Sequence, residues 1–146
     1  MRTPTEARVG VAGESTGRAP TSWGALLLRP QLWFVLWCLL AAITTVLYLL
    51  PNAGPPGQYE LDKVAHLIAF GSIGFSSLLS SPRSRVSSPV LASFVLAMAL
   101  EWLQSYVPGR EYSMLDWGAN LVGLTLGIAV AFGSRAILRP YLDHAV

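Results

Sequence analysis

An uninterrupted apolar run is the feature that most constrains this chain. Gln31 to Leu50 comprises 20 residues without a single charged side chain. As an α-helix the run would be about 30 Å long, which matches the thickness of the hydrocarbon core of a bilayer. A cleaved signal peptide is the competing interpretation, but its basic region would extend to Arg29 and its apolar core would be too long. We therefore expect a transmembrane helix here.

Three more apolar runs follow along the chain. Residues 64–82 contain only His66 as an ionisable side chain, and residues 88–107 contain only Glu101. Charged residues make up 12% of the chain, about half of the roughly 25% that is usual in soluble domains. The sequence therefore predicts an all-α membrane protein whose four transmembrane helices form a small bundle. The expected spans are residues 31–50, 64–82, 88–107 and 116–134.

The segments outside these spans complete the domain organisation. Residues 1–22 are dominated by small and polar side chains, and such a stretch buries too little apolar surface to order itself. We expect a disordered cytoplasmic N-terminal segment over residues 1–22. A four-helix transmembrane domain over residues 23–139 and a short cytoplasmic tail over residues 140–146 follow.

The distribution of basic residues predicts the orientation, because Lys and Arg in short loops are retained on the cytoplasmic side. With the N-terminus inside, eight arginines lie on the cytoplasmic side and only two basic residues lie outside. The eight are Arg2, Arg8, Arg18, Arg29, Arg83, Arg85, Arg135 and Arg139, and the two are Lys63 and Arg110. Both termini are therefore expected in the cytoplasm. Nine of the ten basic residues are arginine, and Ala, Leu and Gly are plentiful, a composition typical of a GC-rich bacterial genome. Together with the four spans, this predicts a multi-pass protein of a bacterial cytoplasmic (inner) membrane.

This topology brings polar residues of three helices to one depth of the outer leaflet. The pairs Asp62–His66 and Asp116–Asn120 are four residues apart, and Glu101–Gln104 are three apart, so each pair shares a helix face. An ionised carboxylate within a span costs roughly 2.5 to 3.5 kcal/mol on insertion scales. Glu101 therefore needs partners, and the candidates are Arg110, Lys63 and His66.

We interpret this group as an outer polar pocket. Two helix N-termini point towards it, and together with Lys63 and Arg110 they could hold an anion such as a lipid phosphate or a carboxylate. Glu101 and His66 are the candidate catalytic residues, since they could position or deprotonate a hydroxyl or an amine. Without a strong nucleophile, binding is better supported than catalysis. The predicted ligand-binding residues are Asp62, Lys63, His66, Glu101, Gln104, Arg110, Ser113, Asp116 and Asn120.

Two other functions stay open. One is a structural or accessory membrane subunit without catalytic activity, which would pack against another membrane protein through the Gly123–Gly127 face or the aromatic first helix. The polar residues would then only hold the helices together. Gly123 and Gly127 form a G-x-x-x-G pair and are predicted to be packing residues that allow another helix to approach closely. A transporter is a third alternative, but four short helices would require oligomers. The expected partners are membrane lipids, a lipid-linked or glycopeptide ligand, or a membrane protein.

Several functions are disfavoured. The 10 basic and 8 acidic residues nearly balance, and the resulting net charge of +2 is too small to indicate a nucleic-acid partner. Cys38 is the only cysteine, so no intramolecular disulfide is available. A metal site built from His66, Glu101 and Asp116 is chemically conceivable, but the pattern is a weak metal signal and we assign no metal. No cofactor motif is present, so none is expected.

The polar motifs together resemble the VanZ-like family of bacterial membrane proteins over residues 62–127. The matching residues are Asp62-Lys63-Val64-Ala65-His66, Phe70, Gly74, Glu101, Gln104, Pro108-Gly109-Arg110, Ser113, Asp116, Asn120 and Gly123. The resemblance implies a small four-helix integral membrane protein. The family's namesake is associated with resistance to the glycopeptide teicoplanin, so the resemblance also suggests a link to resistance against glycopeptides and lipoglycopeptides.

Overall fold

The computed structural model describes residues 29–51, 59–81, 88–109 and 112–143. These residues contain four α-helices and no strand. The helices are α2 (Pro30–Leu49), α3 (Tyr59–Leu79), α4 (Ser88–Gln104) and α5 (Met114–Asp143). The all-helical prediction is therefore confirmed for the described part of the chain. The expected disorder of residues 1–22 lies outside the described residues.

The helix ends differ from the ends of the apolar runs, for local reasons. Helix α3 begins at Tyr59, so Asp62 belongs to its first turn. Helix α4 ends at Gln104, and the N–H groups of the next three residues bond to carbonyls three positions back. This tighter turn leads into Pro108, which disfavours a helical residue before it, and into Gly109 at φ 80°. The predicted third span is thus three residues longer than the helix.

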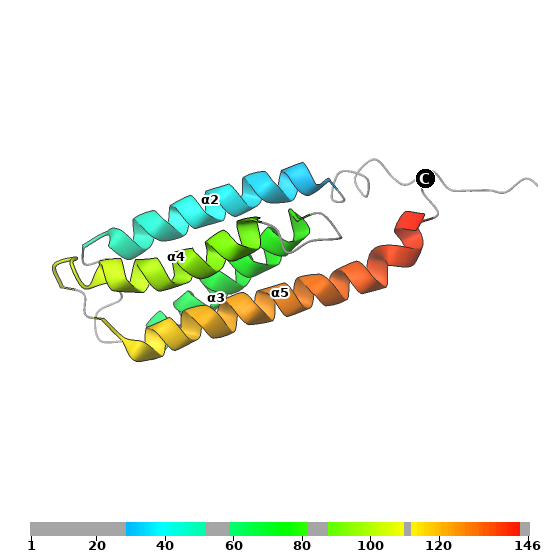
Figure 1. Ribbon diagram of the computed structural model, residues 1–146. Helices are drawn as coiled ribbons and strands as arrows, with labels where there is room; N and C mark the ends of the chain where they lie inside the picture. Colours follow the sequence, from blue (N-terminus) through cyan, green and yellow to red (C-terminus); the bar gives the residue numbers. More distant parts are fainter. Residues whose placement is uncertain (1–28, 52–58, 82–87, 110–111, 144–146) are drawn as a thin grey trace, which may run out of the picture.

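Helix α5 is longer than the expected span at both ends. It begins at Met114 because Ser113 caps it, and it continues to Asp143, into the stretch expected as a cytoplasmic tail. The last turns of α5, drawn in red in Figure 1, bend away from the rest of the helix. Pro140 lies in these turns, and a proline inside a helix removes one backbone hydrogen bond and bends the axis.

The helices run alternately up and down the bundle (Figure 1). The C-terminal ends of α2 and α4 therefore meet the N-terminal ends of α3 and α5 at one end of the bundle. His66 and Asn120, near the starts of α3 and α5, belong to this end, as does Gln104 at the end of α4. The polar residues singled out in the sequence thus gather where the functional site is described below.

Glycines bring α3 and α5 into close contact. A Cβ atom added at Gly127 would overlap the carbonyl oxygen of Gly71, and one added at Gly123 would overlap that of Leu67. The same contact is made from the other helix at Gly74 on α3, where an added Cβ would overlap the carbonyl oxygen of Leu124 on α5. Because only hydrogen fits at these three positions, the two backbones pack directly against each other.

The bundle buries polar side chains beside an apolar core that includes Phe70, Ile73, Leu100 and Leu124, and it exposes many large apolar side chains. Ser76, Ser77, Ser93, Glu101 and Asn120 are fully buried, whereas large apolar side chains on all four helices are exposed. Helices α2 and α5 are each long and apolar enough to cross a membrane, and few residues of either are buried. A core helix of a soluble protein would bury most of its apolar residues. This distribution fits a chain whose outer surface faces lipid.

Candidate functional site

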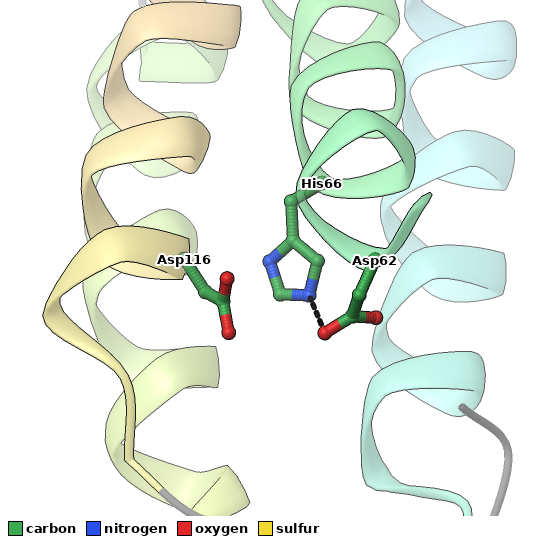
Figure 2. A group of neighbouring side chains, drawn as sticks. All are labelled: Asp62, His66 and Asp116. Carbon is green, nitrogen blue, oxygen red and sulfur yellow. Dashed lines mark ion pairs between the residues drawn. The ribbon is translucent and has the colours of Figure 1, made fainter. Parts of the chain in front are cut away.

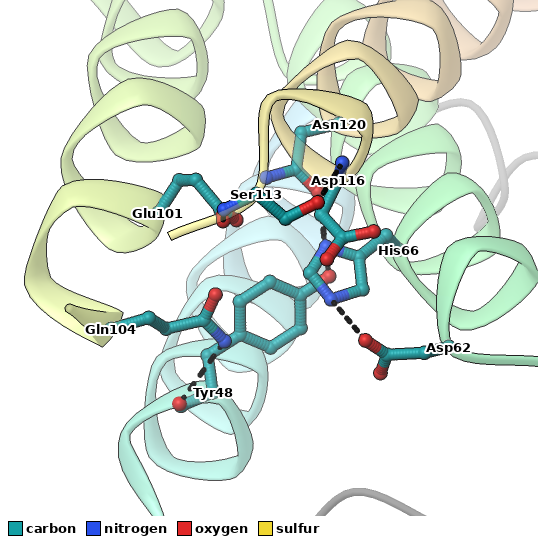
Figure 3. A network of polar contacts seen from close by, with 8 residues as sticks. All are labelled: Tyr48, Asp62, His66, Glu101, Gln104, Ser113, Asp116 and Asn120. Atoms are coloured by element: carbon teal, nitrogen blue, oxygen red, sulfur yellow. Dashed lines mark hydrogen bonds and ion pairs between the residues drawn. The ribbon is translucent and has the colours of Figure 1, made fainter. Parts of the chain in front are cut away.

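Eight polar residues from all four helices meet at the end of the bundle described above (Figure 3). We call this group the polar cluster. It consists of Tyr48, Asp62, His66, Glu101, Gln104, Ser113, Asp116 and Asn120. Four of these side chains, those of His66, Glu101, Gln104 and Asn120, are at most 3% exposed. The structure thus brings together seven of the nine predicted ligand-binding residues.

His66 is held at the centre of the cluster from two sides. Its Nδ1 atom lies 3.0 Å from Oδ1 of Asn120, which makes Nδ1 the donor, because an amide oxygen only accepts. The ring of Tyr48 packs against the imidazole at a centroid distance of 4.4 Å, and its hydroxyl donates to the same Asn120 oxygen at 3.5 Å. The imidazole is therefore fixed in orientation, and its Nε2 atom points away from Asn120.

Two carboxylates flank the imidazole, one on either side of the ring (Figure 2). Oδ2 of Asp62 is 3.7 Å from Nε2 of His66, and Asp116 approaches from α5 (Figure 2). One carboxylate oxygen of each Asp and one ring nitrogen of His66 lie within 4.8 Å of one another. Both Asp side chains are half-buried, so this part of the cluster is the more open one.

Glu101 caps helix α5 from the neighbouring helix. Its Oε1 atom accepts a hydrogen bond of 2.9 Å from the backbone N–H of Ser113, the residue before the first turn of α5. In a capping box this N–H is normally bonded by the acidic residue at the third helical position, which here is Asp116. Because Glu101 takes that role, the carboxylate of Asp116 is available to face His66.

The other half of the capping box forms as the Ser-x-x-Asp spacing predicts. The hydroxyl of Ser113 accepts a hydrogen bond from the backbone N–H of Asp116 at 3.2 Å. The N-terminal end of α5 carries about half a positive charge, and it lies against the buried Glu101. A helix N-terminus thus supplies the partner that the sequence led us to seek among Arg110, Lys63 and His66.

Gln104 joins α4 to the end of α2. Its Nε2 atom donates to the backbone carbonyl of Tyr48 at 3.2 Å, one of the last carbonyls of α2, which have no partner within their own helix. Gln104 therefore serves as interhelical glue and fixes the backbone of the residue whose ring covers His66.

The remaining predicted residues are placed as follows. Lys63 is half-buried on α3 beside Asp62, and Arg110 lies outside the described residues. Gly123 and Gly127 lie against α3, so their face is occupied within this chain.

Tyr48 is the member of the cluster that the sequence analysis missed. The sequence suggests an interfacial aromatic residue, but the side chain is 7% exposed. A signal was present in the sequence, because Thr44 and Tyr48 are polar residues four apart in an apolar run and so share a helix face; they are the two buried residues of α2. A polar stripe on one face of an apolar helix indicates a side that faces protein.

Two polar contacts away from the cluster were also missed. The indole N–H of Trp37 on α2 donates to the hydroxyl of Ser93 on α4 at 2.8 Å. At the opposite end of the bundle, Arg135 on α5 donates to the carbonyl oxygens of Leu78 and Ser81. Arg135 therefore caps the C-terminal end of α3, besides being one of the eight arginines expected on the cytoplasmic side.

The amide nitrogen of Asn120 is a notable donor of the cluster. Nδ2 is buried and has no hydrogen-bond partner among the described residues, whereas Oδ1 accepts from both His66 and Tyr48. A buried N–H group without a partner costs about 1–3 kcal/mol. This atom therefore offers a bond to a small ligand or to water.

An apolar groove of about 540 Å³ runs along α2, α3 and α5, and no residue of the cluster lines it. At one end it is lined by Leu67 and Gly123, which follow His66 and Asn120 by one residue and by three residues. Trp33 and Val130 line it towards the other end. The volume lies within the roughly 300–1,000 Å³ that is usual for small-molecule sites.

Comparison with protein families gave a match. The family model described as VanZ/LLP1 matches residues 15–138, which is most of the chain. No curated protein and no solved structure matches the chain significantly.

Proposed function

The chain belongs to the VanZ-like family, and from this premise we propose that it binds an envelope lipid or a lipid-linked ligand at the polar cluster. The single observation that carries the proposal is a largely buried polar cluster in a bundle that also has an apolar groove, with groove residues Leu67 and Gly123 close in sequence to His66 and Asn120. A lipid has the same two parts, a polar head group and an apolar chain. In the proposal, the head group meets the cluster and the chain lies in the groove.

The proposal includes a topology. The chain is a four-span protein of the bacterial cytoplasmic membrane with both termini in the cytoplasm, so that the polar cluster faces the extracytoplasmic side. The bias of arginine towards the other side supports this orientation. The apolar exterior of α2 and α5 supports a lipid environment.

The chemistry proposed for the head group follows from the donors and acceptors present. Asn120 Nδ2 is a buried donor available to a phosphate or hydroxyl oxygen. Asp62 and Asp116 are acceptors on the open side of His66, and they suit hydroxyl or amine groups of a ligand. Positive charge for an anionic group would come from Lys63, Arg110 and the start of α3. A link to glycopeptide resistance would follow if the ligand is a lipid-linked precursor of the cell envelope.

A tryptophan placed in the groove tests this proposal. Leu126 lines the groove, and Val122, one turn earlier on α5, does not. The two side chains are similarly exposed, at 52% and 51%, so Leu126→Trp and Val122→Trp are matched. The full-length protein is purified from bacterial membranes in mild detergent, and the co-purified lipids are quantified by mass spectrometry.

We expect one class of lipid to be enriched over the bulk membrane composition with the wild type and with Val122→Trp. Leu126→Trp should lose most of this enrichment, because the indole fills the groove. Equal enrichment in both variants would contradict the proposal, as would a wild type that carries only bulk lipid.

The alternative of an accessory subunit has less support. The Gly123–Gly127 face, the surface first considered for a protein partner, is covered by α3. An accessory role would use the other expected surface, the aromatic first helix, where large apolar side chains of α2 are exposed.

A further inference from the structure

Asp62, His66 and Asp116 have the arrangement of a metal site. Each offers one ligand atom, and the three atoms lie within 4.8 Å of one another. Figure 2 shows the two carboxylates on either side of the imidazole, one from α3 and one from α5. The sequence analysis considered Glu101 for such a site, but in the structure Asp62 takes that place and Glu101 caps α5.

Asn120 orients the imidazole of His66 for metal binding. Nδ1 of His66 donates to Asn120 Oδ1 at 3.0 Å, so in the neutral imidazole the lone pair is on Nε2, which faces Asp62. Histidines that bind metals usually donate their other N–H to a carboxylate or carbonyl oxygen in this way. Asn120 and the ring of Tyr48 hold this orientation in a residue that is 2% exposed.

The distances fit a shared ion better than a direct hydrogen bond. Nε2 of His66 and Oδ2 of Asp62 are 3.7 Å apart, which is too far for a hydrogen bond. Tetrahedral ligands about 2.0–2.2 Å from an ion lie about 3.4 Å from one another. The separation of this pair is therefore close to that of two ligands of one ion. The three ligand atoms, which lie within 4.8 Å of one another, have to approach by up to about 1.4 Å, and rotation of the half-buried Asp side chains supplies this movement.

The negative charges of the two carboxylates also favour a cation at this position. Asp62 and Asp116 place two carboxylates against one imidazole, and a divalent cation between them would remove their mutual repulsion. One nitrogen and two oxygen ligands suit a divalent first-row metal such as Zn²⁺ or Mn²⁺. Three protein ligands leave at least one coordination position open.

We propose that Asp62, His66 and Asp116 bind one divalent transition-metal ion, with Asn120 orienting the imidazole. This metal site deepens the proposed function. Metal binding is its first step; the second step, in which an oxygen of the lipid head group takes the open coordination position, rests on the proposed function. A metal would thus explain how a cluster rich in carboxylates receives an anionic group. The first step, metal binding, stands without the lipid.

The test uses the full-length protein purified without a histidine tag, stripped with EDTA and dialysed. Zn²⁺ binding is measured by titration calorimetry, and Co²⁺ serves as a spectroscopic probe of coordination. Asp62→Asn and Asp116→Asn each remove one ligand charge without changing side-chain size. Asp143→Asn, at the other end of α5, is the matched control, and helical content by circular dichroism verifies folding.

We expect one Zn²⁺ per chain, at least a tenfold loss of affinity in Asp62→Asn and in Asp116→Asn, and an unchanged affinity in Asp143→Asn. Should the site variants fail to fold, X-ray absorption of the Zn²⁺-loaded wild type decides. It should show one imidazole nitrogen and otherwise oxygen ligands.

Absence of stoichiometric Zn²⁺ binding, equal affinity in all three variants, or an absorption spectrum without imidazole would overturn the proposal. A protonated His66 paired with the two Asp residues would then explain the cluster. Lipid enrichment that persists after EDTA, with no metal bound, would refute the metal and leave the lipid proposal standing. Metal binding without lipid enrichment would refute the lipid proposal and leave the metal proposal standing.

Discussion

The contact between α3 and α5 gives the sharpest prediction about stability, through the substitution Gly127→Ala. The added Cβ would overlap the Gly71 carbonyl oxygen, and it would lie 2.8 Å from the Gly71 carbonyl carbon and 2.9 Å from the Phe75 nitrogen. Ordinary contacts begin near 3.4 Å. Because these neighbours are backbone atoms and the oxygen is the closest of them, the helices must separate by about 1.5 Å to restore contact distances.

The size of the effect follows from two opposing terms. Overpacking of this kind costs about 1–3 kcal/mol, whereas replacing glycine by alanine in a helix stabilises it by up to about 1 kcal/mol. Gly133→Ala on the same helix isolates the steric term, because a Cβ at Gly133 meets nothing within 4 Å. Gly127→Ala should therefore be less stable than Gly133→Ala by about 1–3 kcal/mol.

The same separation would reach the polar cluster. Asn120 lies two turns before Gly127 on α5, and its 3.0 Å contact with His66 crosses the α3–α5 contact. Unfolding of both variants in mixed micelles, followed by circular dichroism at matched detergent concentration, gives the free energies of unfolding. Equal stability of Gly127→Ala and Gly133→Ala would refute the packing argument.

Three further predictions concern the cluster and its role. Glu101→Leu should lower the free energy of unfolding by about 1–3 kcal/mol, because it leaves the Ser113 N–H without its acceptor; Glu101→Gln keeps an acceptor and should cost only about 1 kcal/mol. Equal effects in the same micelle assay would disprove the capping role. Ser113→Ala should cost about 1 kcal/mol through loss of the helix cap, and Ser134→Ala, whose hydroxyl bonds only within its own helix turn, should cost less; the reverse order would be inconsistent with the cap. A sensitive host expressing the wild type or Val122→Trp should tolerate more glycopeptide or lipoglycopeptide than one expressing Leu126→Trp at matched membrane levels, and no protection by any of the three would separate this chain from the family phenotype.

The sequence predicted the helices and their grouping well, because both depend on local pattern. Long uncharged runs require helices in lipid, and the spacing of Asp62, His66, Asp116 and Asn120 fixed their helix faces. Since successive helices run in opposite directions, residues near the starts of α3 and α5 had to lie at the same end of the bundle as residues near the ends of α2 and α4. The family resemblance is confirmed by the match over residues 15–138.

The pairings within the cluster could not be predicted in the same way. Spacing along one helix does not tell which side chain of another helix it meets. Glu101 therefore appeared to need Arg110, Lys63 or His66, whereas its described partner is a backbone N–H at the start of α5. The role of Tyr48 likewise depends on how α2 is rotated against α3, which is set by packing across the whole bundle.

The measurement that tests the central claim most directly is the membrane topology, because the binding site proposed here must face the extracytoplasmic side. Reporters active only in the periplasm or only in the cytoplasm are fused after Gly57, Ser84 and Arg110, one position for each expected loop. We expect the periplasmic reporter to be active at Gly57 and Arg110 and the cytoplasmic reporter at Ser84. An active cytoplasmic reporter at Gly57 or Arg110 would place the polar cluster on the inner side and contradict the account.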